Sequence, residues 1–330
     1  MHRWLTGLGG FSPHFNATVQ TQSHVLKHIA FAILLFACLC KAAAAQSCQS
    51  LRGINLAGAE FGDVYPGTYG RDYIYPSKET ITYFAKHGAS VVRLPFSWDR
   101  LQQKLTADFD AAELDRLKDT VRLSNDAKMV AILNPHNYAR YNGKVVGSAD
   151  VPNAAFADFW SKLATEFKDN EEIILSLMNE PFDMPVRQWL RASNAALASI
   201  RSVGAKQLVL VPGVHYTGAH SWTDNLPDGN NGRVMRGVRD PGRNFAFDFH
   251  QYLDEDYSGR NNTCPRARDA LKALRSVTRW MARTNTRGFL GEFGGSSSAA
   301  CRRGLEKMAR FVNDNTNRWI GWAYWAAGDW

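Results

Sequence analysis

The sequence contains neither a long hydrophobic run nor a long run of one charge. Its longest apolar stretch, residues 29–39, has 11 residues, whereas a transmembrane helix needs about 20, so we expect no membrane span. The 39 lysines and arginines exceed the 31 acidic residues, which gives a net charge of +8. These basic residues are scattered, however, and nucleic-acid surfaces need them clustered. We therefore expect no nucleic-acid partner.

Metal-binding patterns and domain linkers are also missing. No group of His and Cys residues has the spacing of a metal site, so we predict neither a metal nor another cofactor. The composition is 45% hydrophobic, which is enough for one large core, and no linker divides the chain. We predict a single domain over residues 46–330 and a monomer.

The short apolar run has the layout of a secretory signal peptide. It follows Lys27 and precedes Lys41 and four alanines, as the hydrophobic segment of a signal peptide does. We expect residues 1–45 to form a leader that is cleaved after Ala45, and the mature protein to be secreted and extracellular. A lipoprotein form modified at Cys38 or Cys40 stays open, as does the true start codon.

Three cysteines remain after this cleavage, namely Cys48, Cys264 and Cys301. Export favours disulfide formation. Cys264 and Cys301 each lie in a loop that follows a predicted strand, so we pair them and expect Cys48 to be free. The alternative is that both are unpaired and merely lie near each other.

Eight short apolar runs alternate with amphipathic helical segments over most of the chain. Alternating strands and helices predict a parallel sheet, and eight repeats predict a closed (β/α)8 TIM barrel. Strands covered on both faces are expected to be almost continuously apolar, as several of these runs are. The predicted strands are residues 51–58, 90–97, 128–136, 173–181, 207–213, 244–252, 287–295 and 319–328.

The segments between the strands carry signals for helix ends and one long loop. Ser77 and Ser298 are predicted helix N-caps, and Gly88 and Gly204 are predicted stop positions. Residues 214–243 indicate a loop with at most one short helix. The sequence stops at Trp330 directly after the eighth strand, so the barrel is expected to lack its final helix. Either the chain is truncated or its leading segments cover the gap.

Two glutamates end predicted strands. Glu180 follows the run IILSLM within Asn179-Glu180-Pro181, and Glu292 follows RGFL between two glycines. Parallel barrels keep their active sites at the carboxyl ends of the strands, so folding is expected to bring these carboxylates together. Converging carboxylates suit the cleavage of a glycosidic bond. Taken singly, each could equally be a glutamate at the barrel rim or in a loop.

Further polar and aromatic residues occupy other strand ends, where packing alone would favour apolar side chains. Arg93 could orient a carboxylate or form a buried ion pair. His136 ends the third run, and His250 with Tyr252 ends the sixth. Trp325 in the last run offers a flat apolar ring of the kind on which sugars stack.

Together these residues resemble glycoside hydrolase family 5 of the retaining clan A. The strings HNYARYNG, MNEP, HQYLD and GWAYWAAG are similar to its microbial endo-β-1,4-glucanase branch, and the resemblance covers residues 51–330. The aspartate that the family has two residues before its histidine is Asn134 here. The family's hallmark residues fall on Arg93, His136, Asn179, Glu180, His250, Tyr252, Glu292 and Trp325.

The resemblance implies that Glu180 is the general acid/base and Glu292 the nucleophile of a cellulase. The substrate would be a cellulose-type polysaccharide, cleaved internally with retention and without a metal. We expect Arg93 and Tyr252 to keep Glu292 charged, and Asn179 to hold a sugar hydroxyl.

The same residues do not identify the polymer. Mannan, mixed-linkage glucan and xyloglucan remain alternatives, and an inactive carbohydrate-binding form remains another because the chain stops at Trp330. The candidates for lining the cleft are Trp98, Tyr138, Tyr141 and Trp222, although Trp98 could also be a core residue.

Overall fold

The computed structural model of the protein describes residues 50–328. The predicted signal peptide, its cleavage after Ala45, and the predictions for Cys38, Cys40 and Cys48 lie outside these residues. Within the described part of the chain, no helix is long and apolar enough to cross a membrane.

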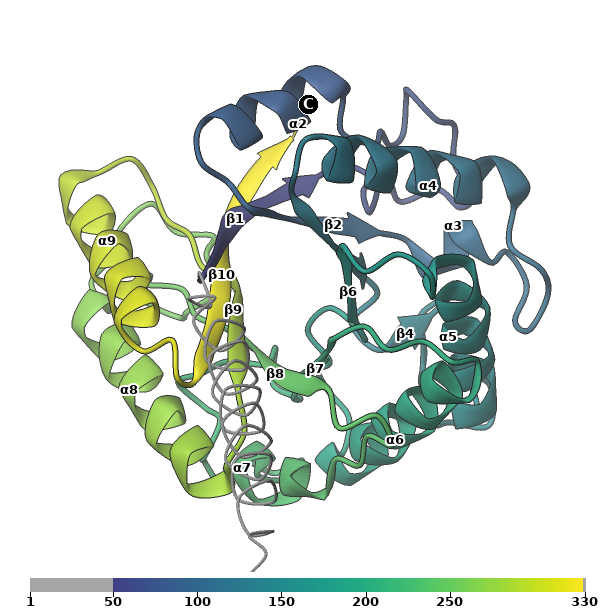
Figure 1. The fold of residues 1–330 in the computed structure, drawn as a ribbon. Coiled ribbons are helices and arrows are strands. Elements are labelled where there is room, and N and C mark those ends of the chain that lie inside the picture. The colour runs from purple at the N-terminus through teal and green to yellow at the C-terminus, as the bar shows by residue number, and fades with distance from the viewer. Residues whose placement is uncertain (1–49, 329–330) are drawn as a thin grey trace, which may run out of the picture. The chain divides into compact units, whose positions relative to one another are not determined.

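Eight parallel strands close into a barrel, in the spatial order β1-β10-β9-β8-β7-β6-β3-β2 (Figure 1). Each of the eight predicted runs contains one of these strands, so the predicted (β/α)8 barrel is confirmed. The strands are β1 (Leu51–Ala57), β2 (Val91–Phe96), β3 (Val130–Pro135), β6 (Ile173–Ser176), β7 (Val209–Pro212), β8 (Phe245–His250), β9 (Gly288–Glu292) and β10 (Trp319–Gly328).

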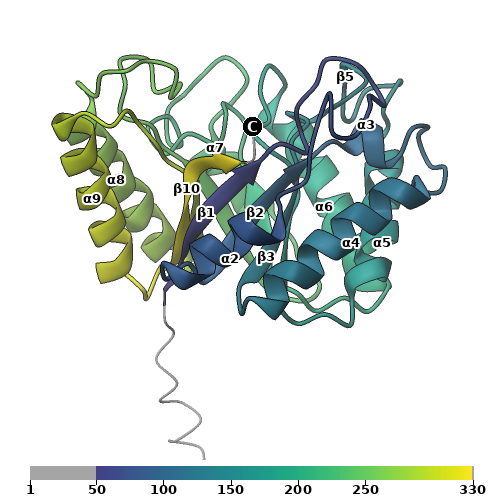
Figure 2. The same ribbon diagram turned by 90° about the horizontal axis from the view of Figure 1, so that it is seen from above.

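The helices surround the barrel, and the loops that follow the strands gather at one end of it (Figure 2). Ser77 and Ser298 cap their helices by accepting hydrogen bonds from the amides of Thr80 and Cys301, as predicted. The helices are α2 (Lys78–Lys86), α3 (Trp98–Leu101), α4 (Ala111–Asp126), α5 (Asn153–Phe167), α6 (Val186–Ser202), α7 (Asn231–Val234), the 3-10 turn η1 (Met235–Gly237), α8 (Ala267–Thr284) and α9 (Ala299–Asp314).

Two connections depart from the simple alternation of strand and helix. A small hairpin, β4 (Arg140–Tyr141) and β5 (Lys144–Val145), follows β3. Residues 214–243 form the predicted long loop, with one short helical stretch made of α7 and η1. β10 is the last element among the described residues, so the absence of a final helix stays a prediction.

The barrel interior changes from apolar to polar along its axis. An inner layer packs residues of seven strands, among them Val91, Ile174 and Ala246. Successive side chains of a strand point to opposite faces, so the residues two positions further on, Arg93, Ser176 and Asp248, also point inward. All three are buried. The apolar layer thus supports a polar layer at the carboxyl ends of the strands.

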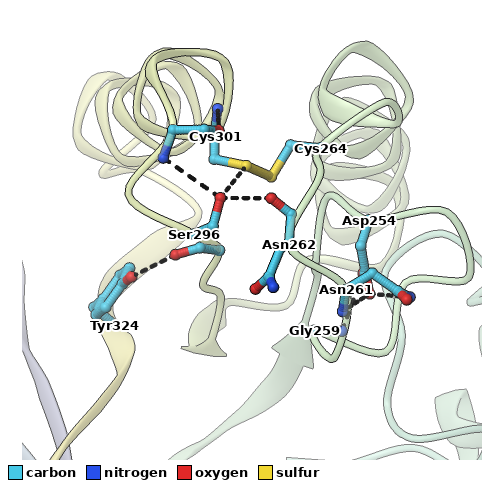
Figure 3. The surroundings of a disulfide bond; sticks show 10 residues. Asp254, Gly259, Asn261, Asn262, Cys264, Ser296, Cys301 and Tyr324 are labelled. Carbon is cyan, nitrogen blue, oxygen red and sulfur yellow. Dashed lines mark hydrogen bonds between the residues drawn. A yellow bond between two sulfur atoms is a disulfide. The ribbon is translucent and has the colours of Figure 1, made fainter.

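A disulfide joins Cys264 and Cys301, as predicted (Figure 3). Cys264 lies in the loop after β8, but Cys301 lies in the first turn of α9 rather than in a loop. Beside the disulfide, the Ser296 hydroxyl donates a hydrogen bond to the Asn262 carbonyl at 2.6 Å. The loop after β8 is therefore fastened covalently and by a hydrogen bond to the segment after β9.

Candidate active site

Glu180 lies just beyond the carboxyl end of β6, with a positive φ of 40°. Pro181 follows it, which helps to keep this segment out of a helical conformation. The Glu180 side chain is 15% exposed, and its Oε1 lies 2.6 Å from His250 Nδ1. Burial raises the pKa of Glu180 to about 7, and the charge of Arg93 opposes this rise. The carboxyl is therefore partly protonated near neutral pH.

Glu292 ends β9 on the same face and is more deeply buried, with 5% of its side chain exposed. Its Oε1 accepts a hydrogen bond from Arg93 Nη1 at 2.8 Å, and its Oε2 accepts one from the Tyr252 hydroxyl at 3.0 Å. Burial raises the pKa of Glu292, whereas His250, Arg93 and the Tyr252 hydroxyl act to lower it. More groups stabilise the ionised form of Glu292 than that of Glu180.

Arg93 connects the two glutamate-bearing segments from inside the barrel. Its Nη2 donates to Asn179 Oδ1 at 2.7 Å, next to Glu180, while its Nη1 bonds Glu292 and also Asn55 Oδ1 at 2.8 Å. Asn55 on β1 in turn donates to the Gly291 carbonyl at 2.9 Å. Since a planar guanidinium fixes several acceptors at once, Arg93 sets the relative positions of β1, β9 and the segment after β6.

The two predicted histidines contact residues of this network. Asn179 Nδ2 donates to His136 Nε2 at 3.0 Å. Burial lowers the pKa of His136 well below its ordinary value and also lowers the pKa of His250. Both rings are therefore neutral near pH 7, and His136 can accept the hydrogen bond that orients the Asn179 amide.

Asn134 stands at the position where the family that the sequence resembles has an aspartate. It is buried in β3, two residues before His136. Its Nδ2 donates to Ser176 Oγ at 3.1 Å, and Ser176 Oγ lies 3.4 Å from Asp248 Oδ2. Asn134 is therefore part of the polar layer beneath the site and makes no hydrogen bond to His136.

A pocket of about 630 Å³ opens above the two glutamates. Trp325 stacks on His136 with ring centroids 5.4 Å apart and forms one wall. Tyr138 also lines the pocket. The structure thus gathers all eight of the hallmark positions and one of the four predicted cleft aromatics.

The other three predicted cleft aromatics are corrections, because the structure places them in the core. Trp98 is fully buried and packs against Phe159. Tyr141 is 4% exposed and donates its hydroxyl to the Gln102 carbonyl. Trp222 is fully buried against Phe249. Long-range helix packing, which the local sequence does not reveal, covers these rings.

Sequence reasoning also missed residues that do line the pocket. They come from the loops after β6, β7 and β8, and the only signal in the sequence is that aromatic and polar residues follow predicted strands. Phe182 and Tyr216 stack with centroids 4.9 Å apart, and His220 stacks on Tyr257 at 4.2 Å. The further polar residues are Asp256, Ser258 and Arg260.

A divalent ion would find possible ligands in Glu180, His250 and Glu292, whose ligand atoms lie within 4.8 Å of one another. Existing contacts compete with such an ion. Both oxygens of Glu292 already accept hydrogen bonds, one of them from the cationic Arg93. These contacts make Glu292 a poorer ligand for a metal ion, and the absence of a metal stays a prediction.

Relatives of known structure share this architecture. XacCel5A, solved in complex with cellopentaose, is 42% identical, with a TM-score of 0.84 over 86% of this chain and 91% of its own. Pseudomonas stutzeri endoglucanase Cel5A, solved with cellobiose, is 31% identical, with a TM-score of 0.78 over 85% of this chain and 84% of its own.

Sequence comparison agrees with the structural similarity. Endo-beta-1,4-glucanase B of Aspergillus niger is 35% identical over 279 residues, which is 84% of this chain and 81% of the relative. The family model described as cellulase, glycosyl hydrolase family 5, matches residues 43–328. The chain therefore belongs to glycosyl hydrolase family 5, the cellulase family.

Proposed function

We propose that the protein is a secreted, retaining endo-β-1,4-glucanase that cleaves cellulose-type glucans by double displacement. The observation that carries this proposal is the approach of the two carboxyls, since one oxygen of Glu180 lies within 4.8 Å of one oxygen of Glu292. Carboxyl separations of about 5 to 5.5 Å are typical of retaining enzymes, whereas inverting enzymes need about 6.5 to 9.5 Å.

Glu180 is the proposed general acid and base. Its pKa of about 7 leaves a proton available below neutral pH for the glycosidic oxygen of the leaving sugar. Once it has given up this proton, the carboxylate can accept a hydrogen bond from His250 Nδ1, 2.6 Å away. It then takes a proton from the water that attacks in the second step.

Glu292 is the proposed nucleophile. Its carboxylate attacks the anomeric carbon and forms a glycosyl ester as the bond to the leaving oxygen breaks, and water later cleaves this ester. Hydrogen bonds from Arg93 and Tyr252 favour its ionised form and fix its orientation. Asn179, held by Arg93 and His136, is proposed to bind the hydroxyl beside the reacting carbon.

The proposed substrate is supported by the pocket lining and by the relatives. Trp325, Tyr138, Tyr216 and Phe182 provide flat apolar rings around the two carboxyls, and sugar rings stack on such surfaces. The relatives compared above are named endoglucanases, and two were solved with cello-oligosaccharides. Secretion rests on the apolar run at residues 29–39 and on the disulfide.

Hydrolysis of cellopentaose, followed by NMR at early times, tests the reaction. We expect new reducing ends to appear first as the β-anomer, and an initial α-anomer would refute retention. Glu180→Gln and Glu292→Gln should each largely abolish release of reducing ends from carboxymethylcellulose. Glu306→Gln, an exposed carboxylate on α9 paired with Arg310, is the matched control and should keep full activity.

A further inference from the structure

A second hollow, of about 500 Å³, lies away from the catalytic pocket and shares no lining residue with it. It is formed by the loop between β1 and α2, together with α3 and the segment around the start of α4. Figure 2 shows this loop rising beside α3. Its volume is within the usual range for small-molecule sites, about 300 to 1,000 Å³.

Arg100 holds the wall of this hollow in place. The side chain is almost fully buried and donates hydrogen bonds to the carbonyls of Ala59, Phe61 and Pro66 at 2.6, 2.8 and 2.7 Å. Its guanidinium also lies 3.7 Å from the ring centroid of Tyr73. The loop between β1 and α2 is therefore fixed at several points and needs little ordering when a ligand binds.

Tyr69 presents an open aromatic surface from this fixed loop. The residue is 44% exposed, although the Arg116 guanidinium lies over its ring, 4.5 Å from the centroid, and the Tyr73 ring lies in a T-shaped arrangement with it, with centroids 5.6 Å apart. These contacts fix the orientation of the ring and cover part of it, and the residue as a whole stays accessible to solvent. A fixed, exposed and flat apolar ring is a stacking surface for a sugar.

The polar groups around Tyr69 retain unused hydrogen-bonding capacity. Glu113 is satisfied by the hydroxyls of Tyr73 and Tyr75 and by Arg116 Nη1. Among residues 50–328, however, no hydrogen-bond partner contacts Arg116 Nε, Arg116 Nη2 or Gln103 Oε1. The hollow therefore offers both donors and an acceptor to an incoming ligand.

The charges that line the hollow balance. Two acids, Asp110 and Glu113, face two bases, Arg100 and Arg116. A balanced set favours neither an anion nor a cation. Together with the open ring, it favours a neutral ligand that is rich in hydroxyl groups.

We propose that this hollow is a second, non-catalytic binding site for a β-glucan chain, with Tyr69 as its stacking surface and Arg116 and Gln103 as its hydrogen-bonding groups. This inference rests on the proposed glucanase function, because that function supplies the polymer. A site outside the catalytic pocket holds insoluble polymer near the enzyme without contributing to cleavage of a short soluble chain.

Adsorption to insoluble cellulose tests the site, measured in the full chain carrying Glu292→Gln so that the polymer stays intact. Adding Tyr69→Ala should lower the partition coefficient about tenfold, which corresponds to about 1.4 kcal/mol. Tyr69→Phe keeps the ring and should adsorb normally. Tyr83→Ala removes a comparably exposed tyrosine on α2 and should also adsorb normally. Equal adsorption of the Tyr69→Ala variant and its parent would overturn the inference.

The hydrolysis rate of cellotetraose, measured with Glu292 intact, separates this site from the catalytic one. We expect no change in this rate for Tyr69→Ala. If Tyr69→Ala slows cellotetraose hydrolysis, adsorption of a Gln103→Ala variant becomes the test of the site, because Gln103 is exposed and makes no contact that holds the loop between β1 and α2. Normal adsorption of the Gln103→Ala variant would then refute the site. A wild-type protein that fails to cleave cellotetraose contradicts the proposed function instead, and the adsorption comparison still stands.

Discussion

Arg93 and Glu292 form an ion pair inside the barrel, with Nη1 2.8 Å from Oε1 and with 0% and 5% of their side chains exposed. The same guanidinium holds Asn179 with its other terminal nitrogen. One cation therefore fixes both the proposed nucleophile and the residue before the proposed acid. Removing one partner of such a buried pair costs about 3 to 5 kcal/mol, because the other charge is left without compensation.

Arg93→Lys should lower kcat and move the acidic limb of the pH profile upward. A lysine has one ammonium group and cannot hold Glu292 and Asn179 together in the fork geometry of arginine. Burial already raises the pKa of Glu292, so weaker pairing raises it further, and the ionised nucleophile appears only at higher pH. The pH dependence of kcat/KM checks this. Arg122→Lys, on the exposed face of α4, is the control, and an unmoved acidic limb would contradict the role of Arg93.

Glu180→Gln should remove the alkaline limb of the pH profile. The pKa of Glu180 is raised to about 7, so its acid form is present below that pH and is lost as the pH rises through it. An aryl cellobioside with a good leaving group needs little proton donation. We therefore expect Glu180→Gln to retain a burst of aryl release from this substrate while cleavage of cellopentaose collapses. Equal loss on both substrates would argue against an acid role for Glu180.

The main features of the fold, and the gathering of the candidate site residues at one end of the barrel, were predictable because they depend on local patterns. Each apolar run that ends in a polar residue is a strand tip, and a closed parallel barrel brings such tips together. Trp98 and Trp222 show where this reasoning stops. A tryptophan after a strand has the same sequence signal whether a helix covers it or a cleft exposes it. That choice depends on packing between distant segments, as with Trp222 against Trp280 of α8.

Asn55 illustrates a residue that sequence alone did not single out. It is polar within an apolar strand, but only the structure shows that it bridges Arg93 and the Gly291 carbonyl. Asn55→Ala leaves buried hydrogen-bonding groups without partners, at a cost of about 1 to 3 kcal/mol. We expect a lower denaturation midpoint together with a lower kcat. Asn125→Ala, a partly buried asparagine at the C-terminal end of α4, is the control and should lower stability without changing kcat after correction for folded protein.

Chelation should leave activity unchanged. Both oxygens of Glu292 and Oε1 of Glu180 are already in contact with Arg93, Tyr252 or His250, and the proposed double displacement needs no Lewis acid. The measurement is the initial rate on carboxymethylcellulose before and after dialysis against EDTA. A loss of activity that a divalent cation restores would show that the glutamate and histidine cluster binds a metal in the working enzyme.

Breaking the disulfide should destabilise the protein and weaken substrate binding. Cys264 and Cys301 are 37 positions apart, and a crosslink over a loop of this length contributes about 4 kcal/mol in the chain-entropy treatment. The crosslink also anchors the loop after β8 (Figure 3), which contributes Tyr257, Ser258 and Arg260 to the lining of the pocket that contains Glu180 and Glu292. Cys264→Ser and Cys301→Ser should each lower the denaturation midpoint, and each should raise KM for cello-oligosaccharides more than it lowers kcat.

The double substitution at Cys264 and Cys301 distinguishes the crosslink from the two side chains. Since either single change already breaks the bond, the double variant should be little less stable than either single one, and the sum of the two single effects should greatly exceed the effect of the double variant. Additive losses would mean that the side chains contribute through packing alone. In that case reduction of the wild-type disulfide should leave KM unchanged, whereas an anchoring crosslink requires KM to rise on reduction.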